Sequence, residues 1–283
     1  MKHTGRFVSG LLVAGMMLAL ANSLCAQSAQ QSSAKVVNIK GSARYMTVGD
    51  ATWHPLKVGT VLKPGAIVQT ASGSYADLVL YNEQATASSA SSSSSTPLVN
   101  ASYNSGAQAR VEQDAVRIFE NTVLGINKLT TTQTGADRVT ETELDLKHGR
   151  ILGTVKKLSA ASKYEVTIPG GVAGIKGTIF LLSSDGELSV LSSLADLEKL
   201  VPSGSVVLAY TGADGNIVTQ VVGDGQHFDK SSGQLVPISD PERTDMIGWA
   251  RELGISPGAP MTFLVEDHTI YFVSPTSGQT PLP

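Results

Sequence analysis

Short segments in which apolar residues recur at every second position run along most of the chain, separated by glycine-containing turns. Ala76, Leu78 and Leu80 fall on one face of residues 75–80, and this period of two predicts a strand with one face in a core. Further strands are predicted over residues 36–39, 43–46, 58–63, 66–70, 116–120, 122–126, 143–146, 150–155, 164–168, 178–182, 188–191, 206–210, 217–222, 261–265 and 269–273. The spacing of strands and turns favours an all-β sandwich, barrel or solenoid.

Four dipeptides predict where the strands turn. Asp185-Gly186 and Asp214-Gly215 each predict a tight hairpin, because Asp and Gly tolerate a positive φ. Pro64-Gly65 and His148-Gly149 predict turns between consecutive strands.

One short helix is predicted near the C-terminus. It begins with Asp240 as N-cap and Pro241 in the first turn, and it ends at Gly254. An apolar stripe at helical spacing predicts a face that docks on a core: Met246, Trp249, Ala250 and Leu253. The helix and the strand pair of residues 261–273 form a C-terminal extension from 231 to 273, followed by a disordered tail over 274–283.

The N-terminus has the pattern of a secretory signal peptide. Basic residues among positions 2–6 precede an apolar run over 7–20, which is shorter than the roughly 20 residues of a membrane-spanning helix. We predict a signal peptide over residues 1–26, cleaved between 21 and 29, and a polar linker over 27–35. An uncleaved N-terminal anchor is the alternative. The residues before Cys25 do not form a lipobox, so we expect a periplasmic or secreted protein that contacts the membrane only through this segment before cleavage.

Composition narrows the classes of function. A hydrophobic content of 41% in 283 residues is enough for a sizeable core. The net charge of −3 becomes −5 when Lys2 and Arg6 are removed, because 19 basic residues then face 24 acidic ones. This balance argues against a nucleic-acid partner. A single cysteine excludes an internal disulfide and a cysteine zinc cage. Residues 84–112 are a low-complexity insertion rich in Ser and Ala, predicted to form a long loop.

Candidate catalytic or metal-binding residues are sparse. No G-x-S-x-G elbow occurs, and the histidines after the signal segment are isolated. They are His54, His148, His227 and His268. Glu266, Asp267 and His268 are predicted to form an exposed turn. His227 with Asp224 and Asp229 could contribute metal ligands, but their spacing matches no calcium loop. We therefore expect no catalytic residue, cofactor or metal, and a secreted hydrolase using His268 or His227 is kept as an alternative.

A glycine-rich stretch over residues 170–178 also contains a lysine and a threonine. Lys176 precedes Gly177, which is the reverse of the order in a Walker loop, and the stretch lies between two predicted strands. No helix begins there to hold an anion, so phosphate binding is not expected.

The same stretch resembles the core motif of FecR domains, and earlier and later motifs agree with that family in order and spacing between residues 36 and 228. The residues that carry the resemblance are Gly41, Trp53, Leu56, Gly59, Leu62, Gly65, Thr70, Ala76, Leu78, Gly149, Pro169, Ala173, Lys176, Gly177, Thr178, Phe180, Gly225 and Gln226. Ile168 and Lys176 replace the usual threonine and arginine. All of these positions are expected to be structural, with Trp53, Leu62, Leu78 and Phe180 as apolar anchors of the core.

The resemblance implies a FecR-like β-sandwich or solenoid domain over residues 36–230 that binds or signals without catalysis. FecR proteins relay a ferric-siderophore signal to a sigma factor, and such a relay is one alternative for this chain. Only six residues precede the apolar run, however, so no cytoplasmic segment is expected. The leading expectation is an exported, non-enzymatic module of the bacterial cell envelope that binds an envelope protein or a glycan.

Overall fold

A computed structural model describes residues 29–81, 114–134, 137–156, 158–192, 204–212 and 214–253. Strands dominate these residues, and the chain is all-β apart from one helix, as predicted. The strands are β1 (Gln30–Gln31), β2 (Ser33–Lys40), β3 (Ala43–Met46), β4 (His54–Pro55), β5 (Val61–Leu62), β6 (Ile67–Thr70), β7 (Tyr75–Tyr81), β8 (Asp114–Ile118), β9 (Val123–Thr134), β10 (Asp137–His148), β11 (Arg150–Thr154), β12 (Lys163–Ile168), β13 (Gly171–Lys176), β14 (Ile179–Ser183), β15 (Leu188–Leu191), β16 (Ser205–Thr211), β17 (Ile217–Gly223), β18 (Gln226–Asp229) and β19 (Gln234–Pro237). The helix is α3 (Asp240–Glu252).

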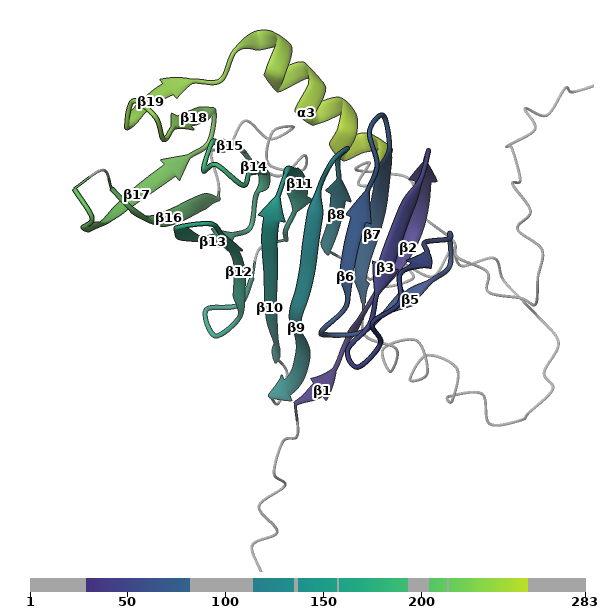
Figure 1. Cartoon of the computed structure of the whole chain (residues 1–283). Coiled ribbons are helices and arrows are strands. Elements are labelled where there is room, and N and C mark those ends of the chain that lie inside the picture. Colours follow the sequence, from purple (N-terminus) through teal and green to yellow (C-terminus); the bar gives the residue numbers. More distant parts are fainter. Residues whose placement is uncertain are drawn as a thin grey trace, which may run out of the picture.

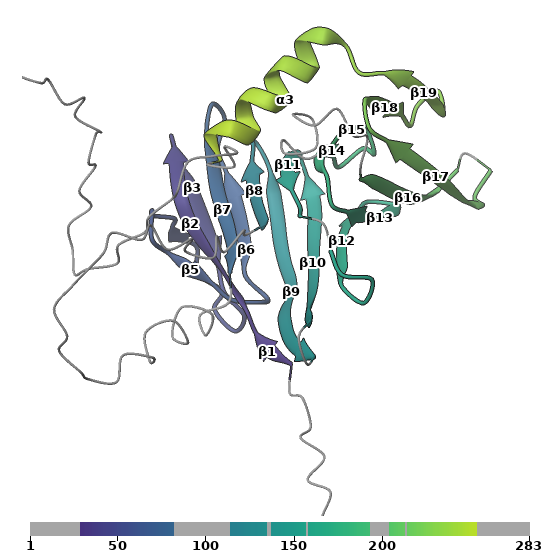
Figure 2. The same cartoon turned by 180° about the vertical axis from the view of Figure 1, so that it is seen from behind.

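Two sheets lie face to face and form a sandwich (Figures 1 and 2). Sheet A has the order β17-β16-β13-β12-β10-β9-β6-β3-β4, with β1 paired to β9, and sheet B has the order β19-β18-β15-β14-β11-β8-β7-β2-β5. From β2 onward the chain crosses from one sheet to the other after every one or two strands. It therefore advances along the sandwich as it winds, and most neighbours within a sheet are also close in sequence.

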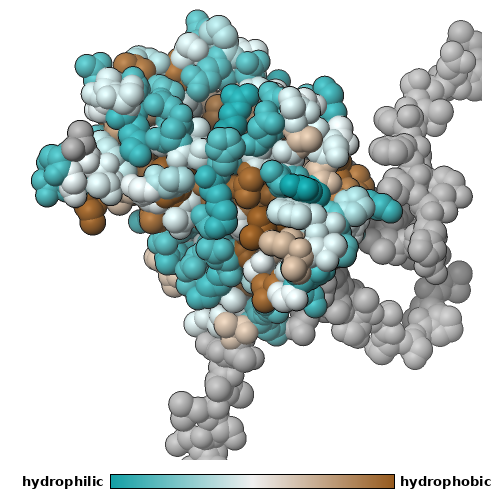
Figure 3. Space-filling view, in the orientation of Figure 1, coloured by the Kyte–Doolittle hydropathy of each residue, from teal (hydrophilic) through white to brown (hydrophobic). Residues whose placement is uncertain are grey.

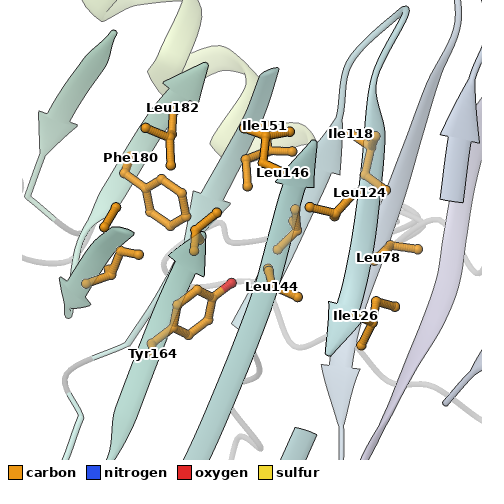
Figure 4. Packing of buried hydrophobic residues seen from close by; sticks show 14 of the residues in the cluster. Leu78, Ile118, Leu124, Ile126, Leu144, Leu146, Ile151, Tyr164, Phe180 and Leu182 are labelled. Carbon is orange, nitrogen blue, oxygen red and sulfur yellow. The ribbon is translucent and has the colours of Figure 1, made fainter. Parts of the chain in front are cut away.

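The main core lies between the sheets (Figure 4). Leu144 and Leu146 of β10 face this core, whereas Glu143 and Asp145 on the other side of the same strand remain partly exposed. Large fully buried side chains from both sheets fill the space, among them Leu78, Ile118, Leu124, Ile126, Tyr164 and Phe180. Alternation thus places one face of each central strand inward, as the sequence pattern predicts.

A second core lies on the outer face of sheet B, beneath α3 (Figure 1). Met246, Ala250 and Leu253 of the predicted helical stripe are buried there against β8, β11 and β14, and Trp249 packs on the ring of Phe119 with centroids 4.8 Å apart. The N-cap is Ser239, whose side chain accepts a hydrogen bond from the Glu242 N–H, so the predicted cap at Asp240 was wrong by one residue.

Several predicted boundaries were wrong. The linker predicted over 27–35 contains β1 and the start of β2, and Ser33 and Ala34 are buried. The extension predicted from residue 231 is not separate, because β19 pairs with β18 and α3 covers sheet B. The turns predicted at Pro64-Gly65 and His148-Gly149 are confirmed, and each joins a strand of one sheet to a strand of the other. The glycine-rich stretch forms β13, paired with β12 and β16, rather than a loop between strands.

Some predictions fall outside the described residues. They are the signal peptide over 1–26, the Ser-rich insertion over 84–112, the strands of 261–273 and the tail over 274–283. Cys25, Glu266, Asp267 and His268 belong to the same parts of the chain.

Candidate functional site

Polar side chains from two strands and the first turn of α3 meet on the outer face of sheet B. Ser189 of β15 lies beside His227 of β18, with 2.7 Å between Ser189 Oγ and His227 Nδ1. The same hydroxyl donates a hydrogen bond to Glu242 Oε1 of α3 at 2.5 Å. Glu187, in the β14–β15 hairpin, lies 3.2 Å from His227 Nε2. We call these four residues the His227 cluster.

The direction of the hydrogen bonds decides what the His227 cluster can do. A carboxylate only accepts hydrogen bonds, so the Ser189 proton points to Glu242, and the hydroxyl oxygen accepts from His227. In a nucleophilic triad the serine proton points to the histidine instead. Ser189 is also only 1% exposed. This arrangement joins the start of α3 to β15 and β18, and it is not the arrangement of an activated serine.

The electrostatics of the cluster centre on Glu187. Burial and the nearby carboxylate of Asp229 raise the pKa of Glu187, while His227 lowers it. Asp229 itself has a lowered pKa, because the side chains of Ser231 and Ser232 donate hydrogen bonds to its carboxylate.

The predicted combination of His227 with Asp224 and Asp229 does not form a metal site. Asp224 accepts a hydrogen bond from the Ser192 N–H at 2.6 Å, and Asp229 is held in the turn after β18. Glu187 and Glu242 lie on opposite ring nitrogens of His227, so their oxygens do not converge on one point. Among the residues that the structure describes, no three His, Cys, Asp or Glu side chains could hold a metal ion together.

A second polar network holds the other end of α3. The guanidinium of Arg117 in β8 makes two hydrogen bonds to Asp77 of β7, at 2.7 and 2.9 Å, and a third to Glu252 of α3 at 2.6 Å. The Arg117 guanidinium also stacks on the ring of Tyr75. Burial lowers the pKa of Arg117, but the bonds to Asp77 and Glu252 outweigh burial and raise the pKa above its ordinary value. α3 is therefore fixed to sheet B at both ends.

An aromatic and polar surface lies on β3 and β4, at the far edge of sheet A. The guanidinium of Arg44 stacks on the half-buried ring of Trp53, 4.5 Å from its centroid, and donates to Gln69. The neighbouring rings of Tyr45 and His54 have centroids 5.6 Å apart. Asp50 accepts a bond from His54 at 2.5 Å, and this bond lowers the Asp50 pKa. Tyr45 and its register partner His54 lie on the other face of this edge, where Tyr45 packs against the main core, so we call Arg44, Trp53 and Gln69 the Trp53 surface.

The predicted motif residues have structural surroundings in most cases. Six glycines have positive φ: Gly41, Gly59, Gly65, Gly149, Gly177 and Gly225. Six apolar residues are buried: Leu56, Leu62, Ala76, Leu78, Ala173 and Phe180. Thr70 donates to the Phe119 carbonyl at 2.5 Å, and Thr178 donates to the Leu191 carbonyl. Gln226 accepts from the Gly223 N–H.

Three motif residues differ from this pattern. Trp53 is half-buried on the Trp53 surface and does not belong to either core, so its prediction as a core anchor was wrong. Pro169 and Lys176 are exposed. The remaining histidine that the structure describes, His148, is exposed at the end of β10.

Five residues of these two networks carry no local sequence signal that predicts their contacts: Glu187, Ser189, Glu242, Arg117 and Asp77. Ser189 and Glu242 are 53 residues apart, and Arg117 and Glu252 are 135 apart. No local motif links positions at such distances. The one available sequence signal for a buried ion pair was a charged residue inside a predicted strand, and Arg117 and Asp77 are both such residues.

Comparisons with protein-family models, with curated proteins and with solved structures found no match to this chain. The FecR resemblance therefore stays a prediction. Within the described residues, no helix is both long and apolar enough to cross a bilayer.

Proposed function

We propose that the chain is an exported, non-enzymatic, FecR-like module of the bacterial cell envelope that binds an envelope protein or a glycan through the Trp53 surface. The half-exposed stack of Arg44 on Trp53 carries the proposal. Tryptophan and arginine are the side chains most enriched among residues that dominate binding energy at interfaces. The signal-peptide pattern and the ordered FecR-like motifs support export and the family.

The chemistry of the Trp53 surface suits both classes of ligand. An indole face packs against apolar side chains or against the C–H faces of a sugar, while Arg44 and Gln69 offer polar groups beside it. The position of Trp53 is built into the fold, because the Arg44 and Tyr45 backbone pairs with Pro55 and His54. Substitutions on this surface should therefore change binding more than stability.

Binding is tested with the purified mature protein and isolated envelope fractions. Trp53→Ala should weaken binding by about thirtyfold, since truncating a dominant interface residue costs about 2 kcal/mol. Val58→Ala, at an exposed apolar position, is the matched control and should bind as the wild type does. Equal binding by wild type and Trp53→Ala would refute the site.

Two further measurements separate the ligand classes and test export. Protease treatment of the envelope fraction should abolish binding if the ligand is a protein, and muramidase treatment should abolish it if the ligand is cell-wall glycan. Fractionation of the producing cells should place the mature protein outside the cytoplasm. A cytoplasmic location would contradict the proposal whatever the binding result.

A further inference from the structure

The two ends of the sandwich are closed differently. At the N-terminal end, the edge strands β4 and β5 have two residues each, and β4 ends at Pro55. At the other end, β17 forms the edge of sheet A with seven residues, and it pairs with β16 over that whole length without a bulge. In the described part of the chain, no strand pairs with the outer side of β17. Sheet A therefore ends in a long, regular, open edge (Figure 1).

The hydrogen bonds define which backbone groups of β17 point outward. The Gly212 N–H bonds to the Asn216 carbonyl at 2.8 Å, which makes 212 and 216 a hydrogen-bonded pair of the β16–β17 ladder. Because such pairs alternate in an antiparallel ladder, residues 218, 220 and 222 bond to β16, and Ile217, Thr219, Val221 and Gly223 point away from it. Two side-chain bonds agree: Gln226 accepts from the Gly223 N–H, and Gln220 donates to the Val221 carbonyl.

Apart from the side-chain bonds to the Val221 carbonyl and the Gly223 N–H, no feature of β17 protects this edge. Its seven residues carry no charge and no proline, whereas natural edge strands are usually short or protected by charge, proline or a bulge. Ile217 is 80% exposed and Val221 is 54% exposed. Uncharged residues also lie beside them on sheet A, since Val207 is the register partner of Val221. Figure 3 shows hydrophobic surface at the left extremity of the view, where Figure 1 places the β16–β17 hairpin.

We propose that β17 pairs antiparallel with β17 of a second copy of this chain, so that sheet A continues across a two-fold axis. A register centred on Gln220 places Thr219 opposite Val221 and Val218 opposite Val222, so apolar and small side chains meet. The seven residues of β17 that pair in this register are Ile217–Gly223, and none of them is charged. No like charges therefore face each other within the paired strands.

The described chain ends far from the edge that β17 forms. The described chain leaves sheet B at Leu253, next to Glu252 and its partner Arg117 in β8. The start of α3 contacts β15 and β18 at the β17 end of the sandwich, and the thirteen residues of the helix place its C-terminus about 20 Å away. The chain therefore leaves the described structure at the far end of α3 from β17. The proposal does not depend on the function assigned to the Trp53 surface.

The proposal is tested by measuring the molar mass of the mature protein in solution with light scattering and sedimentation. The protein concentration is raised to about 100 µM, because a dimer with a micromolar Kd is almost fully formed at that concentration. Wild type should have the mass of a dimer. Val221→Lys and Val221→Glu should each be monomers, since the two like charges would lie diagonally across the two-fold axis on the same face of the continued sheet. An equimolar mixture of the two variants should recover the dimer. Val236→Lys, at an exposed position of the other edge strand β19, is the control and should remain dimeric.

Circular dichroism and thermal unfolding of each variant separate loss of the dimer from loss of the fold. A second variant, Thr219→Pro, removes an outward N–H without removing a bond to β16, and it should also be monomeric. A monomeric wild type, a dimeric and folded Val221→Lys, or a dimer lost equally in Val236→Lys would overturn the proposal. A wild-type monomer that dimerises when residues 254–283 are deleted would show that the chain covers its own edge, and this result also overturns it.

Discussion

The buried pair of Asp77 and Arg117 gives the sharpest test of how α3 is held to sheet B. Asp77 is 1% exposed and Arg117 is 2% exposed, and two hydrogen bonds of 2.7 and 2.9 Å join them. Glu252, the third member of the network, is 60% exposed. The substitutions Asp77→Ala and Glu252→Ala therefore remove two partners of the same guanidinium from very different surroundings.

The magnitudes follow from that difference. Asp77→Ala leaves a buried cation with its exposed partner alone, and removal of one member of a buried ion pair costs about 3–5 kcal/mol. Glu252→Ala removes a partner that water can replace, so its cost should be about 1 kcal/mol or less. Replacement of the pair by apolar residues, Asp77→Leu with Arg117→Met, removes both charges and should recover most of the loss seen in Asp77→Ala.

Urea unfolding at neutral pH, followed by far-UV circular dichroism, measures the free energy of unfolding of the four proteins. We expect the order wild type, Glu252→Ala, double variant and Asp77→Ala, from most to least stable. The reasoning is wrong if Asp77→Ala costs less than about 1 kcal/mol, or if Glu252→Ala costs as much as Asp77→Ala. The second result would mean that the contact with the helix, rather than the buried carboxylate, stabilises Arg117.

Three more predictions concern single positions. The hydroxyl of Tyr164 is buried with no hydrogen-bond partner among the described residues. Tyr164→Phe should therefore leave the free energy of unfolding unchanged or raise it by up to about 1 kcal/mol, as measured by urea titration. A decrease of about 1 kcal/mol would show that the hydroxyl has a partner. Gly149→Ala should lower the midpoint of thermal unfolding much more than Gly59→Ala. Both glycines have positive φ, but a Cβ at residue 149 would lie 2.7 Å from Thr122 Cα, whereas a Cβ at residue 59 would meet nothing within 4 Å. Equal shifts in the two variants would contradict this steric argument. Burial raises the pKa of Asp114, and the hydrogen bond from the Lys156 N–H lowers it in part. A raised pKa means that the folded state holds this proton more tightly, so the stabilisation is full below the ordinary value of 3.8 and is lost as pH rises through the folded pKa. Asp114→Asn should therefore lose less stability than wild type between about pH 4 and pH 7, and equal losses would refute the assignment.

The strands with one buried face were predictable, and the strands in other surroundings were less so. Residues 75–80 and 43–46 alternate clearly and form β7 and β3 close to the predicted bounds. β9 and β10 extend well beyond the predicted 122–126 and 143–146, because their outer halves are rich in Thr and charged residues and show little apolar alternation, although they pair with each other and Leu129 belongs to the main core. β13 was missed because glycines at 171 and 174 remove the side chains that alternation requires.

The candidate site was less predictable than the fold, for a physical reason. A turn signal such as Asp185-Gly186 depends on the φ of one residue, so it can be recognised locally. The contacts of Glu242 with Ser189 and of Glu252 with Arg117 depend on where α3 docks, and docking is decided by the apolar face of Met246 and Ala250. The sequence pattern predicted that face but not its partner.

The alternation of the chain between the two sheets connects these observations. Because each crossing adds strands to the growing end of both sheets, the last strands, β17 and β19, have no successor in the described chain to pair with. Repeat proteins meet the same problem at their ends and need a terminal unit with a polar outer surface. β19 is followed by α3, which folds back over the outer face of sheet B and covers the edge of neither β19 nor β17. At this end sheet B therefore finishes in a strand of four residues that ends at Pro237, whereas sheet A finishes in the longer, uncharged β17, which is where a second copy would continue it.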